Sequence, residues 1–97
     1  MSKDAFDKVI QKEERSADGY FYSYQLIERK GMSMANFGMR LYSITVSMTD
    51  ADGRVRTGEA KDVFSSKKKA TKFFEHIVKN LATPIDLKYV IEDEMTV

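Results

Sequence analysis

The sequence predicts an α+β domain: one antiparallel sheet of about four strands, followed by two C-terminal helices packed on one face of that sheet (ββββαα). In the middle of the chain, apolar and polar residues alternate with the period of a half-buried strand. Near the C-terminus, apolar residues recur at spacings of three and four, the period of an amphipathic helix. Short turn-forming segments separate the strands, which favours antiparallel neighbours over crossover connections.

The N-terminal segment 4–14 allows two interpretations. Ala5, Phe6, Val9 and Ile10 fit one face of a helix. The segment from Ser16 to Gly19 that follows has the composition of a hairpin turn, which favours a strand leading into the next one. We expect a strand, and an αβββαα order is the alternative.

Three further strands are predicted between residues 20 and 64. Residues 20–29 carry large apolar side chains on one side of the expected strand, at Tyr20, Tyr22, Tyr24 and Leu26. From Tyr42 to Thr49, apolar residues alternate with serines and threonines, which is typical of a strand with one buried and one solvated face. Asp50–Gly53 has turn chemistry, so residues 54–64 return as the partner strand. Poor alternation in this last segment indicates an edge strand.

The first predicted helix spans Lys67–Leu81. Ser65 or Ser66 can cap its first turn with a side-chain oxygen. Its apolar residues form a single stripe, which we expect to pack on the sheet. The stripe consists of Ala70, Phe73, Phe74, Ile77, Val78 and Leu81.

A second helix is predicted to start directly afterwards. Thr83 has the position of an N-cap, Pro84 is suited to the first helical position, and Asp86 lies three residues after the cap. Together these residues form a strong start signal. The apolar stripe that we expect to face the core consists of Leu87, Val90 and Ile91.

Composition excludes several classes of function. The 97 residues are enough for one domain (1–97), and 16 basic against 15 acidic residues give a net charge of +1. A chain with so little net charge has no global attraction for nucleic acid or anionic membranes. It has no cysteine and a single histidine, so we expect no disulfide, metal or cofactor. No secretory signal or membrane-spanning segment is recognisable, which favours the cytoplasm.

The C-terminal third contains Thr83-Pro84, Leu87 and the run Val90-Ile91-Glu92-Asp93, with Asn80-Leu81 before them. In these residues it resembles a family of small uncharacterised proteins of Gram-positive bacteria. Tyr42-Ser43-Ile44 is similar to the central strand of that family, which usually has glycine where Ser43 stands. The resemblance implies a compact cytosolic α+β protein, and it supplies no catalytic or binding residues because the family is a domain of unknown function.

The segment from Gly31 to Met39 is the first candidate site. Its nine residues carry no charge, and they make a longer connection than a hairpin needs. Methionine-rich loops either cover the edge of a core or present an adaptable surface to a partner. We expect a partner contact here, through Met32, Met34, Phe37 and Met39.

A lysine cluster is the second candidate site. Lys67, Lys68, Lys69 and Lys72 gather at the start of a helix, where the helix dipole disfavours positive charge. Ser66-Lys67-Lys68-Lys69-Ala70 resembles the start of the last helix of double-stranded RNA-binding domains, whose lysines contact phosphates. That fold also needs an N-terminal helix and a loop histidine, whereas His76 lies inside a helix here. Solvated lysines are therefore the favoured interpretation, and nucleic acid is not the partner that we expect.

No constellation of catalytic residues stands out. Ser65 and Ser66 are explained by helix capping, and His76 falls on the solvent side of its helix without an obvious nucleophile. We therefore predict a non-enzymatic cytosolic protein-interaction module, with an unknown protein partner or self-association. The alternative is a duplex RNA binder that uses the first turn of Lys67–Leu81.

Overall fold

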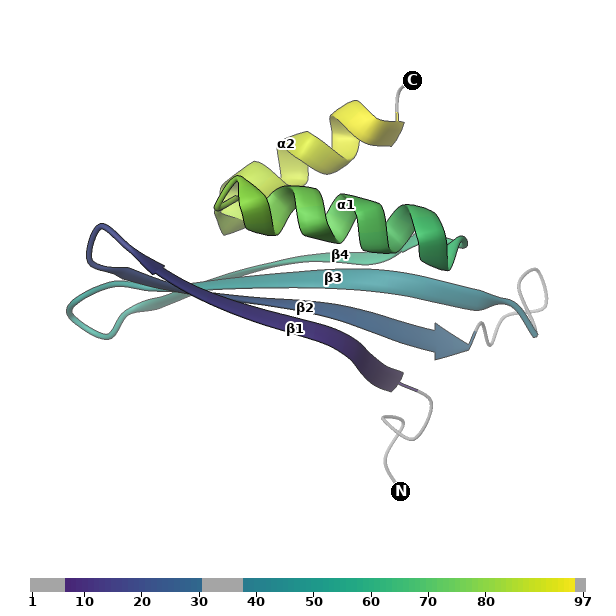
Figure 1. Cartoon of the computed structure of the whole chain (residues 1–97), viewed down its shortest axis with the longest axis horizontal. Helices are drawn as coiled ribbons and strands as arrows, with labels where there is room; N and C mark the ends of the chain where they lie inside the picture. Colours follow the sequence, from purple (N-terminus) through teal and green to yellow (C-terminus); the bar gives the residue numbers. More distant parts are fainter. Residues whose placement is uncertain (1–6, 31–37, 96–97) are drawn as a thin grey trace.

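The computed structural model describes residues 7–30 and 38–95, and within the last helix the side chains up to Glu92. In these residues, four strands precede two helices (Figure 1). The order confirms the predicted ββββαα arrangement. The elements are β1 (Asp7–Ala17), β2 (Tyr20–Lys30), β3 (Arg40–Thr49), β4 (Val55–Phe64), α1 (Lys67–Lys79) and α2 (Pro84–Met95).

The sheet is a simple meander with the strand order β1-β2-β3-β4, and every neighbouring pair is antiparallel. Asp18 and Gly19 connect β1 to β2, and both have positive φ angles of 55° and 83°. This is the backbone of a tight turn whose twist matches the flanking strands. The predicted strand in the N-terminal segment is thereby confirmed from residue 7 onward, and residues 4–6 lie outside the described residues. As expected, β4 lies at an edge of the sheet.

Both helices lie on the same face of the sheet (Figure 1). Helix α1 contacts β2, β3 and β4, whereas α2 contacts β4 and β3. The second helix rises away from the sheet towards the C-terminus (Figure 1). The molecule therefore has two layers, and the opposite face of the sheet has no helix over it in the described part of the chain.

The core lies between the helices and the central strands. Its strand residues occupy every second position, as the alternation predicts, because successive side chains of a strand point to opposite faces. The apolar stripe of α1 packs against these strand residues. The most deeply buried side chains include Tyr24, Leu26, Ile44, Val46, Phe74, Ile77 and Leu87. Val90 and Ile91 pack against this cluster and are partly buried, as predicted.

Specific polar contacts define the helix ends. Ser66, the second of the two candidate caps, accepts a hydrogen bond from the backbone N–H of Lys69 through its Oγ (3.3 Å). Helix α1 ends at Lys79 rather than Leu81, because Leu81 adopts a φ of 51° and cannot continue the helix.

The start of α2 has the capping arrangement that the sequence predicts. Thr83 Oγ1 accepts from the N–H of Asp86, and Asp86 Oδ2 accepts from the N–H of Thr83, both at 3.1 Å. Two N–H groups that lack helical partners are satisfied in this way. The hydroxyl of Tyr24 also donates to the carbonyl of Ala82 (2.9 Å). The connection between the two helices is thus fixed to the sheet.

Ser43 differs from the prediction of a solvated side chain, since it is only 2% exposed. The register of β3 and β4 shifts between Tyr42 and Ile44, and Asp62 in the bulged strand has a φ of 54°. The bulge brings Asp62 onto Ser43, whose Oγ accepts from the N–H of Asp62 at 2.8 Å. The local irregularity of β4, which no alternation pattern reports, buries this hydroxyl.

Candidate interaction surfaces

The first predicted site lies largely outside the described residues. Met32, Met34 and Phe37 fall in the segment 31–37, so the predicted contact through them stays a prediction. Met39 directly precedes β3 and is 45% exposed.

The lysine cluster lies on the outer side of α1. Lys67, Lys68, Lys69 and Lys72 are all exposed. Among the described side chains, none of the four lies within ion-pair distance of a carboxylate. This arrangement is the solvated basic face that we expected from the sequence.

One flank of α1 borders a cavity of about 460 Å³. Its described lining consists of Lys69, Lys72, Phe73 and His76. The sequence placed His76 on the solvent side of its helix, and the structure confirms that it is exposed. The cavity adds an aromatic wall to two of the predicted lysines, which is a combination that the sequence analysis did not anticipate.

Helix α2 exposes two large apolar side chains that the sequence analysis did not single out. Ile85 is 60% exposed and Tyr89 is 64% exposed. Leu87, in contrast, is 1% exposed and faces the core. Ile85 and Tyr89 are four residues apart, so they lie side by side on the outer face of the helix. The available signal was that α2 has more apolar residues than a single core-facing stripe needs.

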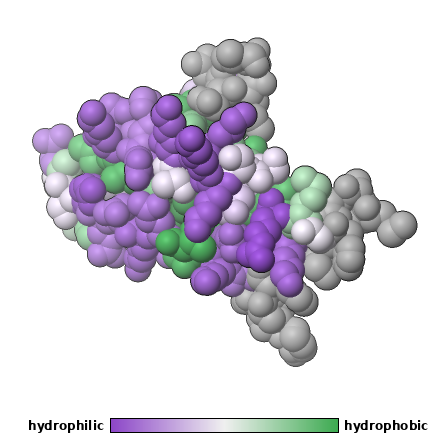
Figure 2. Space-filling view, turned by 45° about the vertical axis from the view of Figure 1, so that its right-hand side comes forward, coloured by the Kyte–Doolittle hydropathy of each residue, from purple (hydrophilic) through white to green (hydrophobic). Residues whose placement is uncertain are grey.

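Two charged side chains flank this apolar pair. Lys88 and Glu92 are exposed, and their spacing from Ile85 and Tyr89 places all four on the same side of the helix. We call Ile85, Lys88, Tyr89 and Glu92 the α2 outer face. In the view of Figure 2, apolar residues form small separate patches among hydrophilic ones. The α2 outer face, with two apolar side chains between two charged ones, is a patch of the same kind.

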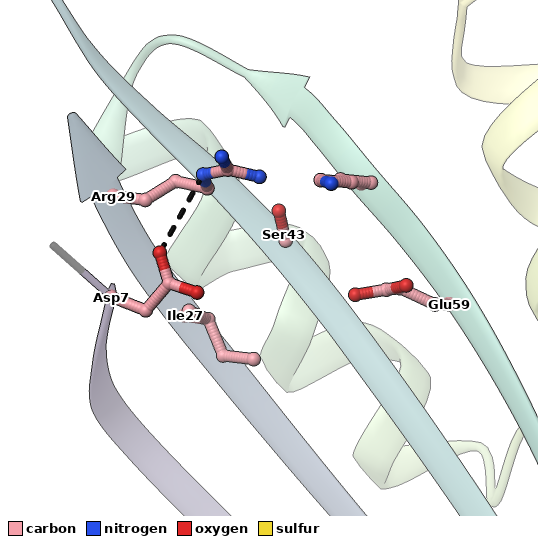
Figure 3. Close-up of a pocket in the computed structure, with 6 residues that line it drawn as sticks. Asp7, Ile27, Arg29, Ser43 and Glu59 are labelled. Carbon is pink, nitrogen blue, oxygen red and sulfur yellow. Dashed lines mark ion pairs between the residues drawn. The ribbon is translucent and has the colours of Figure 1, made fainter. Parts of the chain in front are cut away.

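The uncovered face of the sheet has a cluster of polar side chains near one end of the strands (Figure 3). Arg29 Nε lies 3.6 Å from Asp7 Oδ1, and Arg29 Nη1 lies 3.5 Å from Asp62 Oδ2. Ser43 Oγ also donates to Asp62 Oδ1 at 3.3 Å. Nearby is a cavity of about 210 Å³, lined by Asp7, Ile27, Arg29, Ser43, Glu59 and Lys61.

The contacts of this cluster show that it links neighbouring strands of the sheet. Arg29 of β2 connects Asp7 of β1 with Asp62 of β4, so one guanidinium joins three strands. The hydroxyl of Ser43 is engaged with the backbone and the carboxylate of Asp62, and these bonds hold the bulge in place. The groups thus satisfy one another, as buried and half-buried polar groups need to do.

A second polar cluster lies on the helix-covered side of β2 and β3. The hydroxyl of Tyr42 donates to Glu28 Oε2 at 2.9 Å, and Arg40 Nη1 lies 3.1 Å from Glu28 Oε1. The hydrogen bond from Tyr42 lowers the pKa of Glu28, and Arg40 lowers it further. Burial, followed by the bond to Glu28, raises the pKa of Tyr42. These residues stabilise the pairing of β2 and β3 next to the start of α1.

Within the described ranges, there is no group of three or more His, Asp or Glu side chains that could hold a metal ion. In the same residues, neither helix has the length and apolar character needed to cross a bilayer.

No match to this chain was found among curated proteins or solved structures. Residues 7–97, which contain every strand and helix described above, match a family that is described as a family of unknown function, DUF6514. The chain belongs to this family, DUF6514.

Proposed function

We propose that the chain is a non-enzymatic protein-interaction module of the bacterial cytoplasm and that it docks through the α2 outer face. The observation that carries the proposal is the exposure of Ile85 and Tyr89, at 60% and 64%, on a helix whose opposite side is built into the core. Single exposed apolar residues are ordinary on protein surfaces, but two neighbours on one helix turn form a contiguous contact area.

The chemistry of the face supports a protein partner. Fully burying a large aliphatic or aromatic side chain stabilises a complex by about 1.5–3 kcal/mol. Tyrosine is enriched among the residues that dominate binding energy, because it combines a large apolar ring with a polar hydroxyl. Lys88 and Glu92 add charges of both signs at the rim, which is where charged residues of interfaces are found.

A basic-patch nucleic-acid binder is the second candidate. It is favoured by the exposed lysines of α1, two of which line the cavity beside Phe73. The patch is small, and the chain as a whole has a net charge of only +1. We therefore favour a protein partner at α2 over a nucleic acid at α1.

A pull-down from native lysate, performed with and without nuclease, separates the two candidates. The tagged wild type is compared with the double variant Ile85→Ser, Tyr89→Ser and with the double variant Lys67→Glu, Lys68→Glu. Val55→Thr is the matched control, because Val55 is 61% exposed on β4, away from α2. We expect nuclease-resistant capture that is lost only in the α2 variant. Capture that needs nucleic acid and the lysines would instead support the alternative.

A further inference from the structure

We infer that the cavity on the flank of α1 binds a small phosphate monoester, which Lys69, Lys72 and His76 hold above the ring of Phe73. The cavity has a volume of about 460 Å³, which is in the range of small-molecule sites. Its described lining consists of these four residues, all from one helix. No residue of the α2 outer face lines it, so the inference is independent of the proposed function.

Helical spacing brings the three basic side chains to one side of α1. Lys69 and Lys72 are three residues apart, and His76 follows four residues later, so they are neighbours on the helix surface. All three are exposed, whereas Phe73 is 5% exposed. Phe73 packs on Phe64 at the end of β4, with 5.4 Å between the ring centroids. The buried ring therefore forms the floor of the cavity, and the basic side chains form its rim.

The charges of this rim favour an anion. The ammonium groups of Lys69 and Lys72 have a spacing at which like charges destabilise a helix. Among the described side chains, no carboxylate lies within ion-pair distance of either lysine or of His76. An anion between the two lysines offsets their repulsion and accepts charge-assisted hydrogen bonds from both.

The number of donors favours a phosphate monoester over other anions. Lysine is a common phosphate ligand, and a ring nitrogen of His76 can donate a further hydrogen bond. A terminal phosphate has three acceptor oxygens, one for each of these side chains, whereas a carboxylate has two. A phosphate inside a nucleic acid backbone has two free oxygens and a single negative charge. The cavity therefore suits a small molecule that ends in a phosphate and whose organic part covers Phe73.

The experiment is a titration of the isotope-labelled full chain, followed by NMR spectra of the backbone amides. The probes with a terminal phosphate are adenosine 5′-monophosphate and ribose 5-phosphate. We expect saturable shifts of the amide signals of residues 69–76, with a Kd on the order of 0.1–1 mM. Tighter binding of the nucleotide assigns the organic part to a nucleoside, and tighter binding of ribose 5-phosphate assigns it to a sugar.

Three further probes test the chemistry of the ligand. Adenosine, and a dinucleotide whose only phosphate is a diester, should cause no saturable shifts, because both lack a terminal phosphate. Inorganic phosphate should bind more weakly than the two monoesters, because it leaves Phe73 uncovered. A dinucleotide that binds as tightly as the monoesters, or inorganic phosphate that equals both of them, overturns the inference.

Two double variants of equal net charge locate the site. Lys69→Gln, Lys72→Gln removes both ammonium groups of the rim, so the affinity for adenosine 5′-monophosphate should fall about tenfold. Lys68→Gln, Lys79→Gln removes two lysines of the same helix that do not line the cavity, and its affinity should stay close to that of the wild type. All four positions are exposed, so both proteins should keep the spectral dispersion of the folded chain.

The variants also separate this inference from the proposed function. An equal loss of affinity in the two lysine variants means that α1 attracts phosphate only as a diffuse basic face, which overturns the inference. Amide signals of residues 69–76 that do not shift with any phosphate probe overturn it as well. The double variant Ile85→Ser, Tyr89→Ser should bind phosphate like the wild type. Loss of partner capture through α2 therefore leaves the phosphate site intact, and failure of the phosphate site leaves docking at α2 intact.

Discussion

At the scale of single residues, the fold depends on side chains that fill the space between α1 and the sheet. Phe74 is 0% exposed and lies in the same buried cluster as Ile44 and Ile77. Its ring lies in the middle of the helical stripe, so the surrounding atoms come from both layers. A residue in such a position contributes transfer free energy and fills volume that its neighbours cannot readily occupy.

The first prediction concerns Phe74→Ala. We expect the free energy of unfolding to fall by about 3–5 kcal/mol, because the substitution removes buried surface and leaves a cavity. Urea denaturation followed by circular dichroism measures the change. Val55→Ala is the control, and it should cost far less because Val55 is exposed. A Phe74→Ala protein with nearly wild-type stability would contradict the described packing of α1.

The second prediction concerns pH and Tyr24. Burial raises the pKa of Tyr24 to about 12, compared with an ordinary value of 10.0. Because folding favours the protonated hydroxyl, its contribution to stability is complete below the unfolded pKa. It is then lost as the pH rises through the folded pKa. We therefore expect the free energy of unfolding to decline between about pH 10 and pH 12.

Tyr24→Phe is the variant that isolates this effect. It removes the titrating hydroxyl and its bond to Ala82, so it should cost about 1 kcal/mol near neutral pH. Urea denaturation at several pH values should then show a shallower alkaline decline than the wild type shows. If the free energy of unfolding falls equally steeply with pH in both proteins, Tyr24 does not titrate as its burial requires. Tyr42, whose pKa is also raised, remains in both proteins.

At the scale of elements, the periodic segments could be predicted from sequence and the irregular ones could not. The second and third strands and the first helix follow from strict periods. The fourth strand follows from the turn at Asp50–Gly53, and the second helix follows from its start signal at Thr83 to Asp86. The N-terminal segment stayed ambiguous because the register of β1 shifts between Val9 and Gln11. Val9 therefore pairs with Ile27, while Ile10 packs near the core, and the period-two pattern is interrupted there.

The α2 outer face could not be predicted from the sequence either. Helix α2 has apolar residues on more than one side, so its sequence alone does not show which side the sheet covers. The side that the sheet covers is determined by a contact between two residues that are far apart in the sequence. A Cβ at Gly58 would lie 2.8 Å from the carbonyl oxygen of Pro84, which shows how closely β4 approaches the first turn of α2. That approach seats Leu87 in the core and leaves Ile85 and Tyr89 outside.

The third prediction tests this contact with Gly58→Ala. The added methyl group would collide with the backbone of Pro84, which cannot move as a flexible side chain can. We expect a loss of about 1–3 kcal/mol in the free energy of unfolding. Glu59→Ala, at the exposed neighbouring position, should have a small effect. If Gly58→Ala is as stable as the wild type, then α2 does not pack on β4 at this distance.

At the scale of the whole molecule, the balance of charge decides between the two proposed partners. The chain has 16 basic and 15 acidic residues, yet α1 presents its lysines together on one side. Local concentration of charge attracts polyanions even when the net charge is small. The number of phosphates that can be reached then determines whether attraction becomes stable binding.

The last prediction is that nucleic acid binds only weakly to the lysines of α1. Tight sites that follow a phosphate backbone neutralise roughly 6–10 phosphates, and their affinity falls steeply with salt. The predicted patch offers Lys67, Lys68, Lys69 and Lys72, and the acidic residues elsewhere oppose a polyanion. Any binding should therefore be independent of sequence and largely abolished near physiological salt.

Fluorescence anisotropy with duplex RNA, duplex DNA and single strands at two salt concentrations measures this binding. The Lys67→Glu, Lys68→Glu variant should remain folded, because both side chains are exposed, and it should lose what binding the wild type shows at low salt. Sub-micromolar affinity for duplex RNA at physiological salt, lost in that variant, would contradict the prediction. Such RNA binding would not use the N-terminal helix of double-stranded RNA-binding domains, because β1 occupies that end of the described chain. The binding mode would then have to be built on α1 and the cavity beside Phe73.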